Sequence, residues 1–213
     1  MKNHQTDSSF ALEELMCRLQ IHERTISDIR RDIYENIGQV LSLARLKLIS
    51  LDVNEPEKVG QETKSSGTLV LKAIRDLRKI ANQLSPDDIE RKGFLSSLEL
   101  EIEKLNSYDE YNIQVLTFGD YYTLEPSREL ILFCIIQNIL YENILHSHRK
   151  KTNILIRYKP RVLQIDINYD HPEEMICLSE PSLLVKRKIS TVKGSWKTTI
   201  SSGNKKLSLL IKK

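Results

Sequence analysis

Few residues of this chain have the types and the spacing that catalysis would need. His146 and His148 are two positions apart on a segment that we expect to be helical, so they face different directions and form no metal-binding pair. The chain contains neither a Ser/His/Asp nucleophile motif nor a P-loop. None of its seven glycines falls between Gly119 and Gly194, so no glycine-rich segment lies there to approach a phosphate group closely. The residues alone therefore indicate no enzyme class.

The bulk properties favour a protein of a reducing compartment. Cys17, Cys134 and Cys177 are far apart and lack metal-ligand or redox spacing, so we expect buried thiols. The polar N-terminus has no signal-peptide core, and no run of about 18 apolar residues exists to span a membrane. A net charge of +3 is too small to argue for nucleic acid. We expect a cytoplasmic location, with neither nucleic acid nor a membrane as partner.

A heptad pattern dominates the N-terminal part of the chain. One apolar position recurs every seven residues, and a second stripe lies between its members, with His22 and Asn36 as polar members of that second stripe. The pattern predicts a long helix with a seam that packs against partner helices. Such a helix is not stable alone in water and needs a partner. The predicted seam consists of Leu12, Leu15, Leu19, Ile26, Ile29, Ile33, Val40 and Leu43.

A second amphipathic helix is expected over residues 70–84, ended by Ser85-Pro86. Residues 52–67 contain Pro56, Gly60 and Gly67 among polar residues and are predicted to form a loop. The two helices would form a hairpin, and two hairpins would form a dimeric four-helix bundle. We predict a dimerisation domain over residues 1–88.

The remainder, residues 89–213, is expected to fold as a separate α/β sandwich, which makes the whole chain α+β. Apolar patterns predict helices over 94–105, 130–145 and 183–192. They predict strands over 113–116, 154–158, 162–167, 196–200 and 207–211. This order suggests a sheet covered by helices on one face.

Several segments resemble the histidine kinases related to nitrate sensors. Residues 30–39, RRDIYENIGQ, resemble the phosphoacceptor helix of that family, roughly R-D-L-H-D-x-x-G-Q. Residues 73–78 and 84–86 resemble its second bundle helix, and Lys92-Gly93-Phe94 the entry to its ATP-binding domain. Residues 135–137, Leu140 and His146 resemble the first helix of that ATPase domain, which is of the GHKL type. The resemblance covers nearly the whole chain and is weakest in the C-terminal third.

The motif residue that matters most for kinase activity has changed. The phosphoacceptor histidine of the resembled family falls on Tyr34, whose phenol lacks the imidazole nitrogen that accepts phosphate. The acidic residue that follows the acceptor is kept as Glu35. Gln39 is also kept, and in the family this amide is implicated in placing water for dephosphorylation, although it could equally be a solvated residue of the helix face. His22 lies about three helical turns away, so it suits a polar seam residue better than a substitute acceptor.

The positions that would bind ATP have changed as well. The resemblance puts the Mg²⁺-binding asparagine at Glu142, whose carboxylate would repel a triphosphate, and the glutamate after Gln137 at Asn138. The adenine-binding Asp-x-Gly corresponds to Asp170, which no glycine follows. The resemblance therefore implies a degenerate nucleotide site, and we expect no cofactor and no metal.

The expected function is a pseudo histidine kinase without catalysis in two-component signalling. It would dimerise and bind a response-regulator receiver domain, or a related kinase, around Ile33, Tyr34 and Ile37. An alternative is a phosphatase of phosphorylated receiver domains that uses Gln39 with help from Glu35. A phosphotransfer relay through another histidine is a third possibility.

Overall fold

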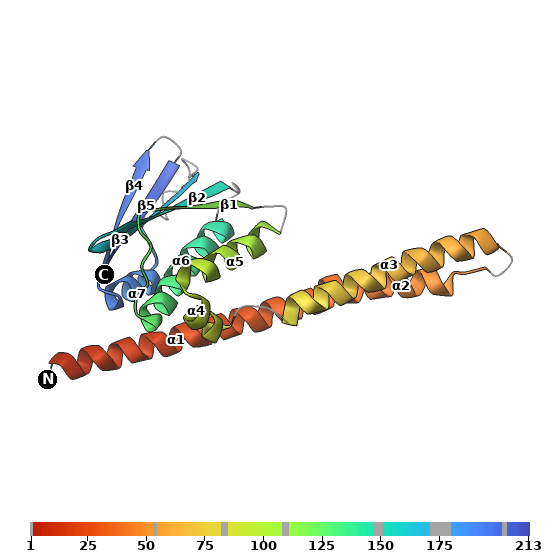
Figure 1. Cartoon of the computed structure of the whole chain (residues 1–213), viewed down its shortest axis with the longest axis horizontal. Coiled ribbons are helices and arrows are strands. Elements are labelled where there is room, and N and C mark those ends of the chain that lie inside the picture. The colour runs from red at the N-terminus through yellow and green to blue at the C-terminus, as the bar shows by residue number, and fades with distance from the viewer. Residues whose placement is uncertain are drawn as a thin grey trace. The chain divides into compact units, whose positions relative to one another are not determined.

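Long helices make up the first part of the chain, and a mixed α+β unit makes up the second (Figure 1). The computed structural model describes residues 2–52, 55–81, 85–107, 111–146, 151–170, 180–201 and 204–213; the side chains of residues 2–7, 79, 81, 143–146 and 170 lie outside this description. The chain divides into two compact units, His22–Ser85 and Met1–Ile21 together with Pro86–Lys213. The predicted domains were 1–88 and 89–213, so the first 21 residues belong to a different unit from the one expected.

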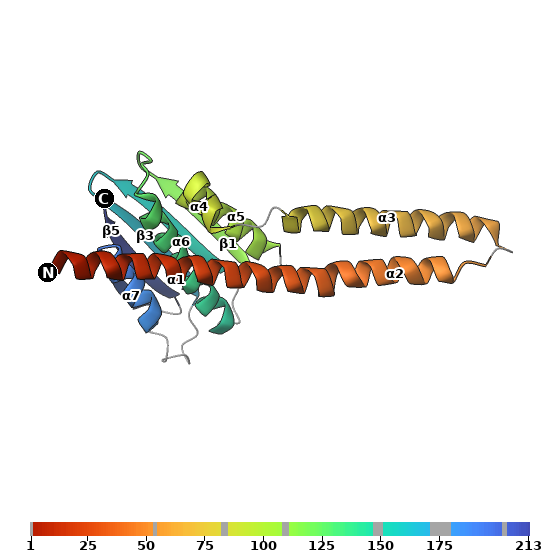
Figure 2. The ribbon, with the colours of Figure 1, turned by 90° about the horizontal axis from the view of Figure 1, so that it is seen from below.

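The unit His22–Ser85 is a helical hairpin. It consists of the end of α1 (Lys2–Arg31), the π-helix η1 (Asp32–Ile37), α2 (Gly38–Ile49) and α3 (Pro56–Ala81). Figure 2 shows α2 and α3 side by side and antiparallel. Small buried residues, Ala44, Ser66 and Ala73, lie between the helices, and the Ser66 hydroxyl donates to the Ala44 carbonyl at 3.3 Å. The predicted hairpin is present.

The loop predicted over residues 52–67 was wrong for most of its length, because α3 begins at Pro56. Proline is tolerated in the first helical turn, where its missing N–H is not needed. Gly60 and Gly67 lie within α3, and each costs about 1 kcal/mol relative to alanine. Packing against α2 offsets this cost, and the Lys47 ammonium forms an ion pair with Glu62 at 2.7 Å.

Most of the predicted heptad seam is exposed in the single chain. The buried positions of the long helix are instead Glu13, Cys17 and Ile21 in one unit and Asp28, Ile37 and Ala44 in the other. An amphipathic helix gains most of its stability by burying its apolar face. The dimeric bundle that would cover these side chains stays a prediction. The exposed seam residues are Leu12, Leu15, Leu19, Ile26, Ile33 and Leu43.

The other unit contains a five-stranded sheet in the order β1-β2-β3-β5-β4. β1 pairs in parallel with β2, and the other neighbours are antiparallel. Alternate residues of β2 and β5 are buried, and the helices α5, α6 and α7 lie on one side of the sheet (Figure 1). The predicted α+β order is confirmed. The strands are β1 (Asn112–Phe118), β2 (Lys151–Lys159), β3 (Val162–Asp170), β4 (Gly194–Ser201) and β5 (Asn204–Lys212); the helices are α4 (Pro86–Lys92), α5 (Phe94–Asn106), α6 (Pro126–His146) and α7 (Leu183–Thr191).

The helix α6 is buried on all sides. Every residue from Glu129 to Leu140 is buried, because the sheet covers one side of α6 and the start of α1 covers another. The Gln20 amide of α1 donates to the Asn138 side chain of α6 at 2.7 Å. A helix with apolar residues all round its circumference requires such cover. Neither α6 nor any other helix within the described ranges is both long and apolar enough to cross a membrane.

Candidate functional site

Tyr34 lies in a short π-helix. In η1 the Gly38 N–H donates to the Ile33 carbonyl, five residues back, instead of four as in an α-helix. A β-carbon on Gly38 would come within 3.3 Å of that carbonyl oxygen, so glycine fits this close approach. Short π-helical turns occur often at functional sites. The turn coincides with the position at which the resembled family carries its phosphoacceptor.

The side chains of this turn differ in their exposure. Tyr34 is 75% exposed and Ile33 is 42% exposed, whereas Ile37 is buried. Ile37 was expected to line the binding surface with Ile33 and Tyr34, but in the single chain its side chain is covered by the hairpin. Glu35 and Gln39 are both exposed. No unusual spacing in the sequence signals the π-helix, although Gly38 permits it.

The second candidate site lies where the resemblance places the nucleotide, between α6 and the sheet. The residues described there line a small cavity of about 20 Å³. That space holds roughly one water molecule, whereas small-molecule sites usually measure about 300–1,000 Å³. Its lining residues are Ile139, Glu142, Tyr169, Glu180, Pro181, Thr198, Lys205 and Leu207.

Large side chains occupy this cavity. The buried Lys205 ammonium lies 5.2 Å from the centroid of the Tyr169 ring, within range of a cation–π interaction. Burial lowers the pKa of Lys205, and the negative charge of Glu142 opposes this effect. Burial also raises the pKa of Tyr169. An ammonium, a carboxylate and a phenol, those of Lys205, Glu142 and Tyr169, thus line this cavity.

Two other predicted site residues lie elsewhere or are only partly described. Asn138 is buried against Gln20 of α1 and does not line the cavity. Its neighbour Gln137 donates to the Glu101 carboxylate of α5 at 3.0 Å, which ties α5 to α6. The backbone of Asp170 ends β3, while its side chain lies outside the described residues. Both amides therefore have structural partners inside the unit.

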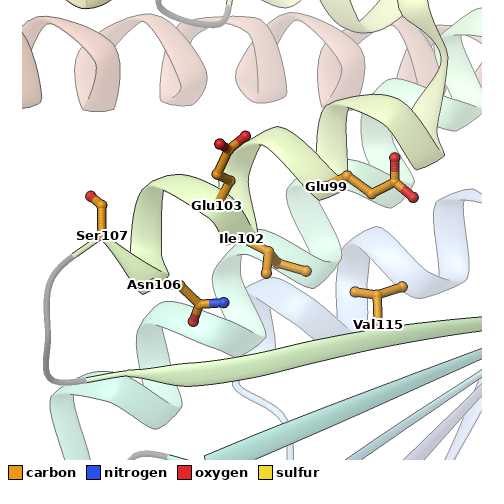
Figure 3. Close-up of a pocket in the computed structure, with 6 residues that line it drawn as sticks. All are labelled: Glu99, Ile102, Glu103, Asn106, Ser107 and Val115. Atoms are coloured by element: carbon orange, nitrogen blue, oxygen red, sulfur yellow. The ribbon is translucent and has the colours of Figure 1, made fainter.

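A wide, shallow groove of about 600 Å³ lies between α5 and the edge strand β1 (Figure 3). Asn106, at the base of the groove, exchanges two 2.8 Å hydrogen bonds with the backbone of Ile113 and thereby occupies the edge of β1. Glu99 and Glu103 give the groove a negative lining. These residues bring together no set of groups suited to catalysis. Across the described ranges, no three His, Cys, Asp or Glu side chains are grouped to hold a metal ion.

Neither the protein-family models nor the curated proteins contain a match to this chain. Among solved structures, it is similar to the Acinetobacter baumannii histidine kinase AdeS, with 12% identity, a TM-score of 0.45, and coverage of 85% of this chain and 97% of that one. The histidine kinase domain of the Erythrobacter litoralis EL346 blue-light activated histidine kinase has 12% identity and a TM-score of 0.42, with coverage of 82% of this chain and 95% of that one. The catalytic domain of histidine kinase ThkA has 10% identity and a TM-score of 0.42, with coverage of 56% of this chain and 91% of that one. Similarity at this level assigns neither a family nor an activity to this chain.

Proposed function

We propose that this chain is a pseudo histidine kinase, a signalling protein that dimerises and binds a response-regulator receiver domain or a related kinase without transferring phosphate. The observation that carries the proposal is Tyr34. It stands where the resembled family has its phosphoacceptor, and it is exposed on a π-helical turn beside an exposed isoleucine, Ile33. An exposed tyrosine next to an aliphatic side chain suits a protein–protein contact, because it offers a large apolar area with a polar end.

The cavity at the predicted nucleotide position supports the loss of kinase chemistry. The cavity lined by the described residues, about 20 Å³, is much smaller than the pockets that usually hold small molecules. A ligand at this position would have to displace the buried Lys205 side chain and the half-buried Tyr169 ring beside it. Glu142 would also place a carboxylate near the phosphates, where like charges repel.

The exposed seam supports dimerisation. Leucine and isoleucine side chains at heptad spacing, left exposed by the single chain, are the pattern that helices bury in coiled coils and bundles. Sedimentation velocity over a range of protein concentrations tests this part. We expect a dimer that dissociates when Ile26 and Leu43 are both replaced by Glu. A monomer at all concentrations would contradict the dimer.

The docking surface is tested by titrating purified receiver domains into the protein by calorimetry. Ile33→Glu and Tyr34→Ala should weaken binding of the partner by about tenfold or more, as expected for central apolar contacts. Leu183→Glu is the matched control, because Leu183 is 83% exposed on α7 in the other unit. Equal effects of all three substitutions, or no binding to any receiver domain or kinase, would contradict the proposal. Binding heat on addition of Mg-ATP, together with transfer of radiolabel from ATP to the protein, would show a working kinase instead.

A second function, a phosphatase of phosphorylated receiver domains, is favoured by one observation. Gln39 and Glu35 are both exposed beside Tyr34, so an amide and a carboxylate are accessible to a docked partner. The amide would position the attacking water, a role that requires no nucleotide.

Phosphate release from a phosphorylated receiver domain distinguishes this function from simple binding. Gln39→Ala should lower the rate by about a hundredfold if positioning is its role, while leaving affinity for the receiver domain unchanged. Gln61→Ala is the control, because Gln61 is an exposed glutamine of the same hairpin. Unchanged release by the Gln39 variant would exclude this mechanism.

A further inference from the structure

A buried cluster of reactive and charged side chains lies where α1, α6 and α7 meet. Cys17 of α1 and Cys134 of α6 are fully buried, and the Cys134 thiol donates to the Cys17 carbonyl at 3.6 Å. The Lys188 ammonium of α7 lies 3.2 Å from the Cys17 sulfur. All of these residues belong to one compact unit. Two thiols and an ammonium are thus held within contact distance in a region that excludes bulk water.

A buried carboxylate anchors the lysine. Glu13 is buried and forms ion pairs with Lys188 at 3.2 Å and with the Arg187 guanidinium at 2.9 Å. Lys188 is 1% exposed, and a buried ammonium is stable only when it is paired. The arrangement therefore keeps a positive charge beside the Cys17 sulfur, shared between the Glu13 carboxylate and the thiol.

The surroundings favour the thiolate form of Cys17. Hydrogen bonding with the Cys134 thiol lowers the pKa of Cys17, burial opposes this effect, and the charge of Lys188 lowers the pKa further. The negative charge of Glu13 acts in the opposite direction. The thiolate is the form of cysteine that reacts with peroxides and disulfides.

We propose that Cys17 and Cys134 form an oxidisable dithiol, in which hydrogen peroxide oxidises Cys17 and Cys134 then closes a disulfide between α1 and α6. In the first step the Cys17 thiolate attacks one peroxide oxygen, the O–O bond breaks, and Cys17 becomes a sulfenic acid while hydroxide leaves and takes up a proton. In the second step the Cys134 sulfur attacks the Cys17 sulfur, and the S–O bond breaks with release of water. Two electrons pass from the thiols to the peroxide, and a thiol reductant reverses the reaction.

The position of the pair gives the disulfide a structural effect. It would join residues 17 and 134, which are far apart in the chain, and so attach the start of α1 covalently to the α/β unit. A crosslink that closes so long a loop restricts the unfolded chain strongly. Because both sulfurs are buried, the reaction depends on transient opening of the helix packing and is slower than oxidation of an exposed thiol.

The test is peptide mass spectrometry on the full chain after treatment with hydrogen peroxide and blocking of the remaining thiols. We expect a peptide pair joined through Cys17 and Cys134 that disappears on reduction. The oxidised protein should unfold about 5–15 °C higher than the reduced protein. In the Cys134→Ser variant, Cys17 should be oxidised to sulfinic or sulfonic acid, and the unfolding temperature should not rise. Cys177→Ser is the control and should leave the crosslink unchanged.

Lys188 supplies a second test that a merely structural role would not satisfy. Lys188→Met should slow oxidation of Cys17 severalfold, because it removes the positive charge that lowers the pKa of the Cys17 thiol. Lys188→Arg keeps the charge and should restore most of the rate. Three results would each overturn the proposal: oxidation only after unfolding, a crosslink of Cys17 to Lys188 through an added oxygen atom, or a disulfide that uses Cys177.

Discussion

Replacing Asp166 with asparagine removes a buried charge from the sheet face opposite the helices. Asp166 is fully buried although it lies on that open face, because Arg157, Gln164 and Lys206 surround it. Burial alone would raise the pKa of Asp166, but hydrogen bonds from Ser208 and these three side chains outweigh it and lower the pKa to about 2 from 3.8. A fall of this size corresponds to about 2 kcal/mol of folding free energy.

The direction of the pH dependence follows from the two pKa values of Asp166. The folded-state pKa, about 2, is below the unfolded value, so between them the unfolded chain binds more protons and stability falls as the pH falls. The Asp166→Asn variant should therefore be less stable by about 2 kcal/mol at pH 7 and at pH 5. At pH 3 the difference should shrink to about 1 kcal/mol.

Urea unfolding at fixed protein concentration measures this difference. The fluorescence of Trp196, the single tryptophan, reports on the sheet, because Trp196 lies in β4. Asp120→Asn is the control, since Asp120 is an exposed carboxylate in the loop after β1. The reasoning is refuted if the Asp166→Asn variant loses the same free energy at pH 3 as at pH 7. It is also refuted if Asp120→Asn has an equal effect.

Three further substitutions, two of them with a matched comparison variant, test the packing of the fold, each measured by thermal and urea unfolding. Gly119→Ala should destabilise the fold by about 1–3 kcal/mol, because Gly119 has a φ of 88° and an added β-carbon would clash with the Tyr158 carbonyl oxygen. Gly67→Ala should instead stabilise the fold by about 0.5–1 kcal/mol, because an added β-carbon at this position of α3 meets open space. Phe133→Ala should cost about 3–5 kcal/mol, since Phe133 is fully buried in α6, and a cost below about 1 kcal/mol would mean that α6 is not the core. Glu129→Ala should cost about 2–3 kcal/mol, because its carboxylate accepts 2.8 Å hydrogen bonds from the backbone of Phe94 and of Leu124, whereas Glu125→Ala, at an exposed position, should change little.

Local pattern predicted most of the elements, because each depends on residues close in sequence. The alternation over 154–158 and 162–167 predicted β2 and β3, and the apolar run over 130–145 predicted α6. The errors have local causes too. Gly60 and Gly67 suggested a loop where α3 continues, since sequence alone does not show that α2 supports this helix. The short helix α4, after Pro86, has too few turns to give a period.

The site required information that no spacing in the chain contains. Cys17 and Cys134 meet only because α1 packs on α6, so their separation in sequence gave no sign of a pair. Asn138 was placed at the nucleotide position by resemblance, yet its amide pairs with Gln20 of α1. The cavity near Glu142 is small because Tyr169 and Lys205 fill it from the sheet, and a motif comparison does not register the volume of neighbouring side chains.

The π-helical turn also determines the direction in which the side chains of α2 face. A π-turn holds one more residue than an α-turn, so the helix after Ile37 is rotated by about 100° relative to an uninterrupted α-helix. Ile26 and Val40, two heptads apart in sequence, therefore do not continue one straight stripe. Deleting a single residue within the turn would convert it to α-helix and leave every later side chain facing as before, because the deletion removes the extra residue that the π-turn accommodates. A second deletion would instead rotate the whole face of α2 by about 100° while leaving its composition intact.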